Sequence, residues 1–400
     1  MAPDRAPAPR FSLLCFGFVV CGFVTVLPGP LLPVMAAKWG LRDVQSGGFF
    51  AAEFAASTVG AIFSPHRLRR NLPTGYALMS AGVFLLMVAS ESVQAMLGHA
   101  LALTAFSLIG LGIGLSVTAT NLYVGSAAQE THRGDRARGL SVVNLWWGIG
   151  AVACPWLIAA TEGGGWLRAF LVLVALGAAF MFFGLSPQLR VTETPSSIPA
   201  RTSLAQDAGL LAFFAVFLFL YVGAENTISG WITTYAHRFS GLSLENASLL
   251  VSLFWIALLT GRALGAAALR RLPERAVLLP SLVLALAAIA VLLEPHSTRV
   301  VLVAVALAGA GFGPVFPLGV ARLLARVGDH RNTGWVFAMC ASGGAVLPWL
   351  AGLVSTHTGS LRLGFAVAVA AVAAILVLAL LEMAILRRLS PLREPATRQT

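Results

Sequence analysis

The chain has 400 residues, of which 58% are hydrophobic and only 11% are charged. Soluble globular domains carry roughly a quarter of their residues as charges, so this composition excludes a water-soluble domain and predicts a protein whose solvent is lipid. The net charge of +11 would suit a nucleic-acid-binding protein only if the basic residues formed one patch.

Twelve apolar stretches follow one another along the chain, and each can cross a bilayer core of roughly 30 Å as a helix. They cover residues 11–35, 46–65, 74–94, 97–125, 140–160, 167–187, 208–236, 245–268, 276–293, 300–320, 334–355 and 362–386. Backbone that touches lipid must satisfy its hydrogen bonds within its own segment. We therefore expect an all-α membrane protein with twelve transmembrane helices.

The basic residues divide unequally between the two sides of these helices. Of the 27 Lys and Arg residues, those outside the inner segments are Lys38, Arg42, Arg168, Arg238, Arg299 and Arg362 on the outer side, and Arg262 within a helix. An excess of Lys and Arg marks cytoplasmic loops. This predicts an integral protein of the plasma (inner) membrane with both termini in the cytoplasm, and it argues against a nucleic-acid partner.

The first two predicted helices carry the first interruptions of the apolar pattern. Pro28, Gly29, Pro30 and Pro33 are expected to break the first helix, and such breaks are tolerated where backbone lines a cavity or rests on protein. Glu53 lies deep in the second helix. An ionisable group near the bilayer centre costs roughly 2.5–3.5 kcal/mol on insertion scales, so Glu53 is a candidate for proton coupling or for a structural pair.

The fourth and fifth helices each present a face of small and polar residues at helical spacing. These are Gly110, Gly114, Thr118, Asn121 and Gly125 in the fourth, and Ser141, Asn144, Gly148, Ala151 and Pro155 in the fifth. Such a face can line a polar pathway, or it can let two helices pack closely. Trp146 and Trp147 add aromatic surface that could stack on a sugar ring.

The second half of the chain repeats features of the first half in the same order. Gly60 precedes Arg69-Arg70 as Gly261 precedes Arg270-Arg271, the glycines 110, 112 and 114 return at 309, 311 and 313, and GAVACPWL in the fifth helix returns as GAVLPWL in the eleventh. This predicts two pseudo-symmetric six-helix bundles, residues 1–187 and 208–400, the second ending in a short cytoplasmic tail. Residues 188–207 would form a cytoplasmic linker.

The seventh helix carries the densest polar cluster. Glu225 has Tyr221 one turn before it and Ser229 one turn after it, with Asn226 and Trp231 close by. A carboxylate beside hydroxyl, amide and indole groups could bind a sugar or carry a proton, or Glu225 could hydrogen-bond a neighbouring helix. We also expect Gly223 and Gly230 to interrupt this helix.

Later helices add candidate gating and stacking residues. Arg262 lies about 12 Å from the inner basic cluster at a helical rise of 1.5 Å per residue, so it could snorkel or hold a gate through an unidentified partner. Pro314 and Pro317 are expected to break the tenth helix, and Phe316 and Trp335 are further candidates for stacking.

The twelve-helix plan with basic clusters after the second and eighth helices resembles the major facilitator superfamily. Within it, the segments YVGAENTISGWITTY, NLWWGIGA, GPVFP and SGGAVLPWLAG are similar to the fucose-permease-like branch. The resemblance implies alternating access around a central cavity lined by Glu225, Trp231, Asn121 and Asn144, and import of hexoses or related solutes, often with protons.

Two departures limit what the resemblance implies. Ser64 and Pro65 stand where the superfamily's loop signature has an acid and its first base. The acidic residues of fucose permease have no counterpart here, because the first helix has none and the position in the fourth falls near Val117. Proton coupling would then rest on Glu225 or Glu53.

Taken together, these features predict a secondary active or facilitative transporter for a sugar or similar small polar solute, working by alternating access. The expected substrate-binding residues are Glu225, Asn226, Trp231, Asn121, Thr118, Asn144, Trp147, Tyr221, Phe316 and Trp335, and the expected gating residues are Arg262, Arg69, Arg70, Arg270 and Arg271. An exporter of amphipathic drugs or metabolites is the alternative.

No HExxH, GxSxG or metal-ligand spacing occurs, so we expect no enzyme, no cofactor and no metal. The expected partners are the solute, protons and the lipid bilayer, and the expected state is a monomer.

Overall fold

The computed structural model of the chain describes residues 10–127, 133–162, 167–185, 204–294, 297–327 and 333–389, and among these residues there is no β-strand. The first half forms α1 (Phe11–Val26), α2 (Pro28–Trp39), α3 (Asp43–Phe63), the short 3₁₀ turn η1 (Ser64–Arg67), α4 (Leu68–Glu91), α5 (Ala95–Ala127), α6 (Arg133–Glu162) and α7 (Leu167–Leu185). The second half forms α8 (Leu204–Phe239), α9 (Leu244–Ala268), α10 (Glu274–Val291), α11 (Thr298–Phe312), α12 (Val315–Val327), α13 (Thr333–Thr358), α14 (Leu361–Gly364) and α15 (Ala366–Leu389).

These helices make the twelve predicted crossings. Ten stretches of the described chain are long and apolar enough to span a membrane, and one of them, Asp43–Glu91, holds both α3 and α4. The remaining crossing is α7, whose apolar part, Leu171–Leu185, is shorter. The expected all-α membrane architecture is therefore confirmed.

Two of the three expected helix breaks are present. The first crossing divides into α1 and α2 at Leu27-Pro28, and the tenth divides into α11 and α12 at Gly313-Pro314. Proline removes a backbone donor and clashes with the preceding turn, which explains why these crossings divide there.

The break expected in the seventh crossing was wrong. Helix α8 runs from Leu204 to Phe239 without interruption. Glycine costs a helix interior only about 1 kcal/mol, which packing can offset. A β-carbon on Gly223 would press on Leu347 and the Gly343 carbonyl of α13, and one on Gly230 would press on Phe50 of α3. These glycines serve close packing in place of a break.

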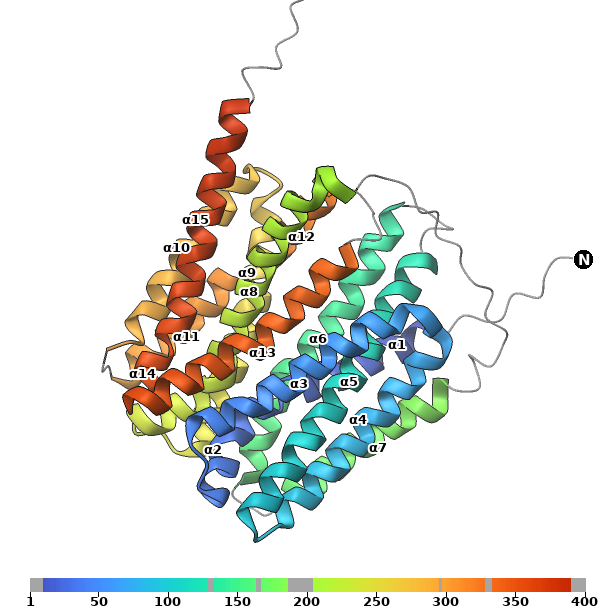
Figure 1. The fold of residues 1–400 in the computed structure, drawn as a ribbon, viewed down its shortest axis with the longest axis vertical. Helices are drawn as coiled ribbons and strands as arrows, with labels where there is room; N and C mark the ends of the chain where they lie inside the picture. Colours follow the sequence, from blue (N-terminus) through green and yellow to red (C-terminus); the bar gives the residue numbers. More distant parts are fainter. Residues whose placement is uncertain are drawn as a thin grey trace, which may run out of the picture.

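We group the helices by chain order into two bundles, α1 to α7 and α8 to α15 (Figure 1). In the first, α5 packs on α3 and α4, α1 on α6, and α4 on α7; in the second, α11 packs on α9 and α10, and α15 on α8 and α10. The bundles meet mainly where α3 lies on α13, α6 on α9, and α2 on α8. We call the side at which α1 begins and α15 ends the terminal side, and the opposite side the far side.

The repeated glycines occupy matching places in the two bundles. Gly110 and Gly114 on α5 lie against the backbone of α3, and an added β-carbon would overlap the carbonyl oxygens of Glu53 and Ser57. Gly309, near the end of α11, lies in the same way against the carbonyl oxygen of Phe254 on α9. The small-residue face of α5 is therefore, at its glycines, a helix-packing seam.

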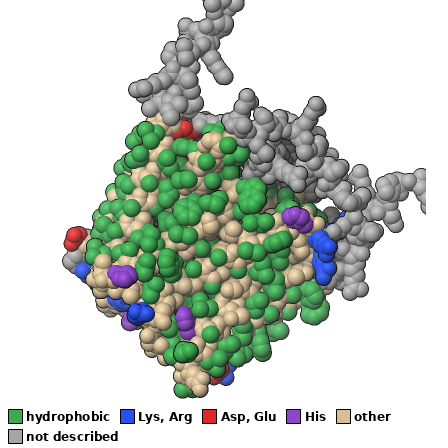
Figure 2. Space-filling model, viewed as in Figure 1, with side chains coloured by type: hydrophobic (Ala, Val, Ile, Leu, Met, Phe, Trp, Pro, Cys, Tyr) green, Lys and Arg blue, Asp and Glu red, His purple; other side chains and the backbone are tan. Residues whose placement is uncertain are grey.

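The surface fits a lipid environment. Figure 2 shows one face of the molecule covered mainly by hydrophobic side chains, with the coloured charged groups near its edges. Large apolar side chains such as Phe84, Phe180 and Phe183 are more than half exposed. Such extended exposed apolar surface is typical of a protein that contacts lipid chains.

Candidate functional site

A polar cluster lies at the middle of α8, where the sequence predicts it. The Tyr221 hydroxyl donates to Glu225 Oε1 at 3.0 Å, and it also lies 3.1 Å from the carbonyl oxygen of Phe312. Arg262 of α9 places Nη2 3.8 Å from the same carboxylate oxygen. The Glu225 side chain is only 9% exposed and that of Arg262 is 27% exposed. The partner of Arg262 that could not be identified from sequence is thus Glu225.

Close helix packing sets this geometry. Gly261 on α9 lies against the backbone of Ala310, and Gly313 lies against the backbone of Leu258 and Arg262. Because no β-carbon stands between them, α9 and the α11–α12 junction approach closely. The Arg262 side chain is thereby held beside α8 and within reach of Glu225.

Aromatic rings border the cluster on one side. The Tyr221 ring lies 5.5 Å from Phe312 and 5.6 Å from Phe316, measured between ring centroids. The structure therefore brings Phe316, predicted from sequence, next to Tyr221 and Glu225. A charged pair beside aromatic faces can hydrogen-bond hydroxyl groups and also cover the apolar face of a ring.

The other predicted residues of α8 lie differently. Asn226 is partly exposed and donates its side-chain amide to the Val222 carbonyl at 2.8 Å. Trp231 is fully buried, its indole N–H donates to the Pro348 carbonyl of α13 at 2.9 Å, and its ring lies 6.3 Å from Phe50. Trp231 lies about 9 Å along the helix from Glu225. The structure does not bring it to the Glu225–Arg262 pair.

The candidates of the first bundle are spread over α5 and α6. Thr118 and Asn121 are partly buried, and Asn121 Oδ1 has no hydrogen-bond donor among the described residues. Asn144 is exposed and donates its amide to Leu140 at 2.8 Å. Trp147 stacks edge-on against Trp255 of α9 at 5.2 Å, so it contacts the opposite bundle.

Glu53 stands apart from the Glu225 cluster. It is 1% exposed, and neither carboxyl oxygen has a hydrogen-bond partner among the described residues. The Cys154 thiol on α6 is close enough to interact with it electrostatically. No counter-charge to Glu53 occurs in the described part of the chain.

Apart from Arg262, which lies in the Glu225 cluster, the predicted gating arginines lie at helix ends on the terminal side. Arg70, Arg270 and Arg271 are exposed and Arg69 is partly buried, while Trp335 at the start of α13 is 66% exposed. These positions place them near the membrane surface, away from the Glu225 cluster.

Neutral side chains hold the turn η1, where Ser64 and Pro65 replace the acid and the first base of the superfamily's loop signature. Ser64 donates to the Leu115 carbonyl of α5 at 2.7 Å, and Asn71 donates to the carbonyls of Phe63 and Ser64, both at 3.1 Å. Hydrogen bonds to backbone thus fix η1 at the position where the family pattern has charged residues.

Sequence reasoning missed an ionic contact between the bundles on the far side. Arg238 at the end of α8 donates from Nη1 and Nη2 to both carboxylate oxygens of Asp43 at 2.8 and 2.7 Å. Ser355 of α13 donates to Asp43 Oδ2 at 2.5 Å, and the backbone N–H of Val44 donates to Thr356 at 2.9 Å. We call this set the far-side latch. Its members are distant in sequence, so no local pattern could have paired them.

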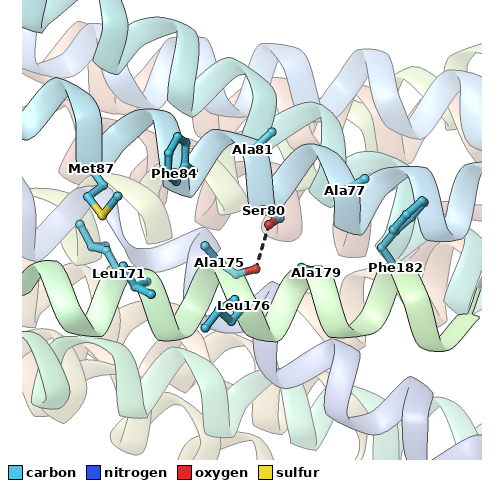
Figure 3. A pocket seen from close by; sticks show the side chains of 11 residues that line it. Ala77, Ser80, Ala81, Phe84, Met87, Leu171, Ala175, Leu176, Ala179 and Phe182 are labelled. Carbon is cyan, nitrogen blue, oxygen red and sulfur yellow. Dashed lines mark hydrogen bonds between the residues drawn. The ribbon is translucent and has the colours of Figure 1, made fainter.

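A lateral hollow of about 470 Å³ lies between α4 and α7 (Figure 3). It is lined by Ala77, Ser80, Ala81, Phe84, Met87, Leu171, Val172, Ala175, Leu176, Ala179 and Phe182. The Ser80 hydroxyl already donates to the Ala175 carbonyl at 2.8 Å. The lining is otherwise apolar and belongs to one bundle, so it is unsuited to a polar solute.

Residues 14–333 match the sequence profile of the Major Facilitator Superfamily. The chain belongs to this superfamily. Its members are transporters and not enzymes, as the sequence predicted. A glucose/galactose transporter of Brucella abortus biovar 1 (strain 9-941) is 24% identical over 366 residues, covering 86% of each chain. Bypass of stop codon protein 6 of Saccharomyces cerevisiae is 23% identical over 388 residues, covering 86% of this chain and 76% of the relative.

Solved structures of transporters share the fold. The fucose:proton symporter of E. coli has a TM-score of 0.59 at 18% identity, covering 92% of this chain and 97% of that chain. A D-xylose-proton symporter gives 0.69 at 14% identity, covering 91% and 96%, and a peptide transporter gives 0.71 at 16% identity, covering 96% and 97%. Their substrates differ, so at these identities the likeness shows the major facilitator fold alone.

Proposed function

We propose that this superfamily member carries a sugar, or a similar small polar solute, across the plasma (inner) membrane by alternating access. The observation that supports this most is the Tyr221–Glu225–Arg262 cluster, a polar group with adjoining aromatic rings in the middle of an otherwise apolar bundle. A relative over most of the chain is named as a glucose/galactose transporter, which favours a sugar over an amphipathic drug.

The spacing of the cluster suits a hydroxylated solute. At 3.8 Å the Arg262–Glu225 contact is longer than a direct hydrogen bond, so both groups retain capacity to bind sugar hydroxyls. Tyr221 and Phe316 would cover an apolar face of the ring. Asn226, Thr118, Asn121, Asn144 and Trp147 are the predicted groups that would complete the site, and Trp231 and Trp335 would serve in other states of the cycle.

The far-side latch supports the interpretation that the structure is a state of the transporter closed on the far side. Contacts between the bundles cluster toward the far side: Gly29 lies against Ser229 and Gly230, and Gly47 lies against Trp349. With the basic residues gathered on the terminal side, we assign the far side to the outside and both termini to the cytoplasm. Opening to the outside would then require the latch to break.

Direct binding of sugars tests the proposal. Purified protein should gain thermal stability with glucose, galactose, fucose or xylose, and proteoliposomes should exchange the same labelled sugar across the membrane. Glu225→Gln and Arg262→Gln should each weaken binding at least tenfold, because each removes a charged hydrogen-bonding group from the site.

Glu245→Gln provides the matched control, because Glu245 is exposed at the far-side end of α9. It should bind sugar like the wild type. Stabilisation by amphipathic compounds alone, with no effect of Glu225→Gln, would contradict the proposal and favour an exporter.

A further inference from the structure

Two buried acids lie in the middle of the membrane-spanning region, and their surroundings differ. Glu225 has the Tyr221 hydroxyl at 3.0 Å and the Arg262 guanidinium at 3.8 Å. Glu53 has neither a hydrogen-bond donor nor a counter-charge among the described residues, although it is 1% exposed. An ionised carboxylate is strongly disfavoured in such a site, whereas a neutral carboxylic acid is tolerated. The two acids therefore suit different tasks.

The groups that face Glu53 from neighbouring helices are nearly all apolar. On α5, the turns around Gly110 hold only apolar residues and hydroxyl groups, from Leu103 to Val117. On α13, the turns around Gly344 hold Cys340 as their one titratable group, and Cys340 interacts with Glu225. On α6, Cys154 is close enough to Glu53 for an electrostatic interaction. No cation from these described elements is available to it.

A structural role does not account for Glu53. The repeat places Phe254 of α9 at the equivalent position, since Gly309 lies on the Phe254 backbone as Gly110 lies on the Glu53 backbone. The same helix packing is thus made around an apolar side chain in the other bundle. A buried carboxyl that makes no hydrogen bond destabilises the fold, so its presence needs another reason.

Glu53 also lies on the helix that seals the two bundles together. One turn before it, Phe50 packs on Trp231 and Gly230 of α8, and the adjoining Phe54 packs on Gly344 of α13. Alternating access separates these surfaces, so opening the far side would bring water to α3 beside Glu53. The carboxyl then has one state exposed to water and one state sealed from it.

We propose that Glu53 is the proton-carrying group of the transport cycle and that Glu225, held by Arg262, binds the solute. Glu53 takes up a proton from water when the far side is open, and it enters the sealed state as a neutral acid. Release of the proton to the terminal side requires a further state of the cycle, in which water reaches Glu53 from that side. This assignment rests on the proposed sugar transport and decides between the two acids that the sequence leaves open.

The test compares Glu53→Gln and Glu53→Met with the wild type. Both variants should fold with unchanged or higher thermal stability, bind sugar normally and retain sugar exchange at equal concentrations on both sides. Both should lose accumulation driven by a proton gradient, and sugar uptake should lose its pH dependence. Glu225→Gln should instead lose sugar binding.

Several results would overturn the assignment. Gradient-driven accumulation that survives in Glu53→Gln would exclude Glu53 as the proton carrier, and so would a wild type that exchanges sugar without any response to a proton gradient. Loss of folding in both variants would show a structural role, and loss of sugar binding would place Glu53 in the solute site. A wild type that neither binds nor exchanges any sugar would refute the proposed function itself.

Discussion

Trp231 shows how one side chain can join elements that must later move apart. Its indole N–H bonds Pro348 within the second bundle, and its ring contacts Phe50 of the first bundle. The hydrogen bond holds α8 to α13 within one bundle, whereas the ring contact with Phe50 joins that bundle to the other. Opening of the far side by separation of the bundles would break the ring contact and keep the hydrogen bond.

Trp231→Phe tests the hydrogen bond. The change keeps an aromatic ring but removes the N–H and leaves the Pro348 carbonyl without this donor, so unfolding should become easier by about 1 kcal/mol. Thermal unfolding in detergent measures the effect. Trp156→Phe is the control, because Trp156 is 58% exposed. Equal stability of the two variants would contradict the structural role of the indole N–H.

At the residue scale, the sequence placed Tyr221 and Glu225 one turn apart on one helix face, because helical spacing and depth in the membrane can be read from one chain. It gave Phe316 only as a stacking candidate, and the structure brings that ring 5.6 Å from Tyr221. The sequence could not pair Glu225 with Arg262, since that contact depends on how α8 and α9 pack. It also missed Asp43, which follows a turn and carries no periodic signal. Local patterns predict which residues are unusual, but tertiary packing decides what they meet.

Among the helices, the contacts at the glycines of α5 and α11 are close, and they leave no room for a larger residue. Gly110 brings α5 so close to α3 that any β-carbon would overlap the Glu53 carbonyl oxygen. Backbone cannot move aside as a flexible side chain can, so the helices would have to separate.

Gly110→Ala should therefore destabilise the first bundle by about 1–3 kcal/mol, the usual range for overpacking a close-packed core. Gly177→Ala on α7 is the control, since its β-carbon would lie 3.8 Å from Val20 at ordinary contact distance. Alanine favours the helix, so this control should be neutral or slightly stabilising. The yield of monodisperse protein and its thermal unfolding would measure both, and a neutral Gly110→Ala would show that the seam is looser than the structure indicates.

The helix breaks show the limits of prediction at this scale. The first and tenth crossings divide beside a proline as expected, although Pro155 and Pro348 lie within the continuous helices α6 and α13. Glycine did not divide α8, because its weak helix propensity yields to packing. The repeated glycines, by contrast, make matching close helix contacts in both halves of the chain, since the same close approach requires the same small residue.

For the whole molecule, the far-side latch joins the two bundles through charge-assisted hydrogen bonds. Asp43→Asn removes the charge while keeping the shape, and it should shift the population toward a state open on the far side.

Labels at the far-side residues Gln94 and Glu245, which are exposed and lie in different bundles, would report the shift as a longer distance by electron paramagnetic resonance. The four native cysteines are buried, so introduced cysteines can be labelled selectively. Glu91→Gln is a control, because Glu91 pairs with Arg168 within the first bundle. An unchanged distance in Asp43→Asn would show that apolar contacts alone hold the far side closed.

The far-side latch also makes the closed state sensitive to the ionic strength of the surrounding solution. The Arg238 side chain is 38% exposed, so dissolved ions reach one partner of the pair while the other stays sheltered. Mobile ions screen such a contact over about 8–10 Å at moderate ionic strength. At higher ionic strength the closed state would lose part of its electrostatic support, and the population would shift toward a state open on the far side. Ionic strength is thus expected to shift the conformational population through this one partly exposed ion pair.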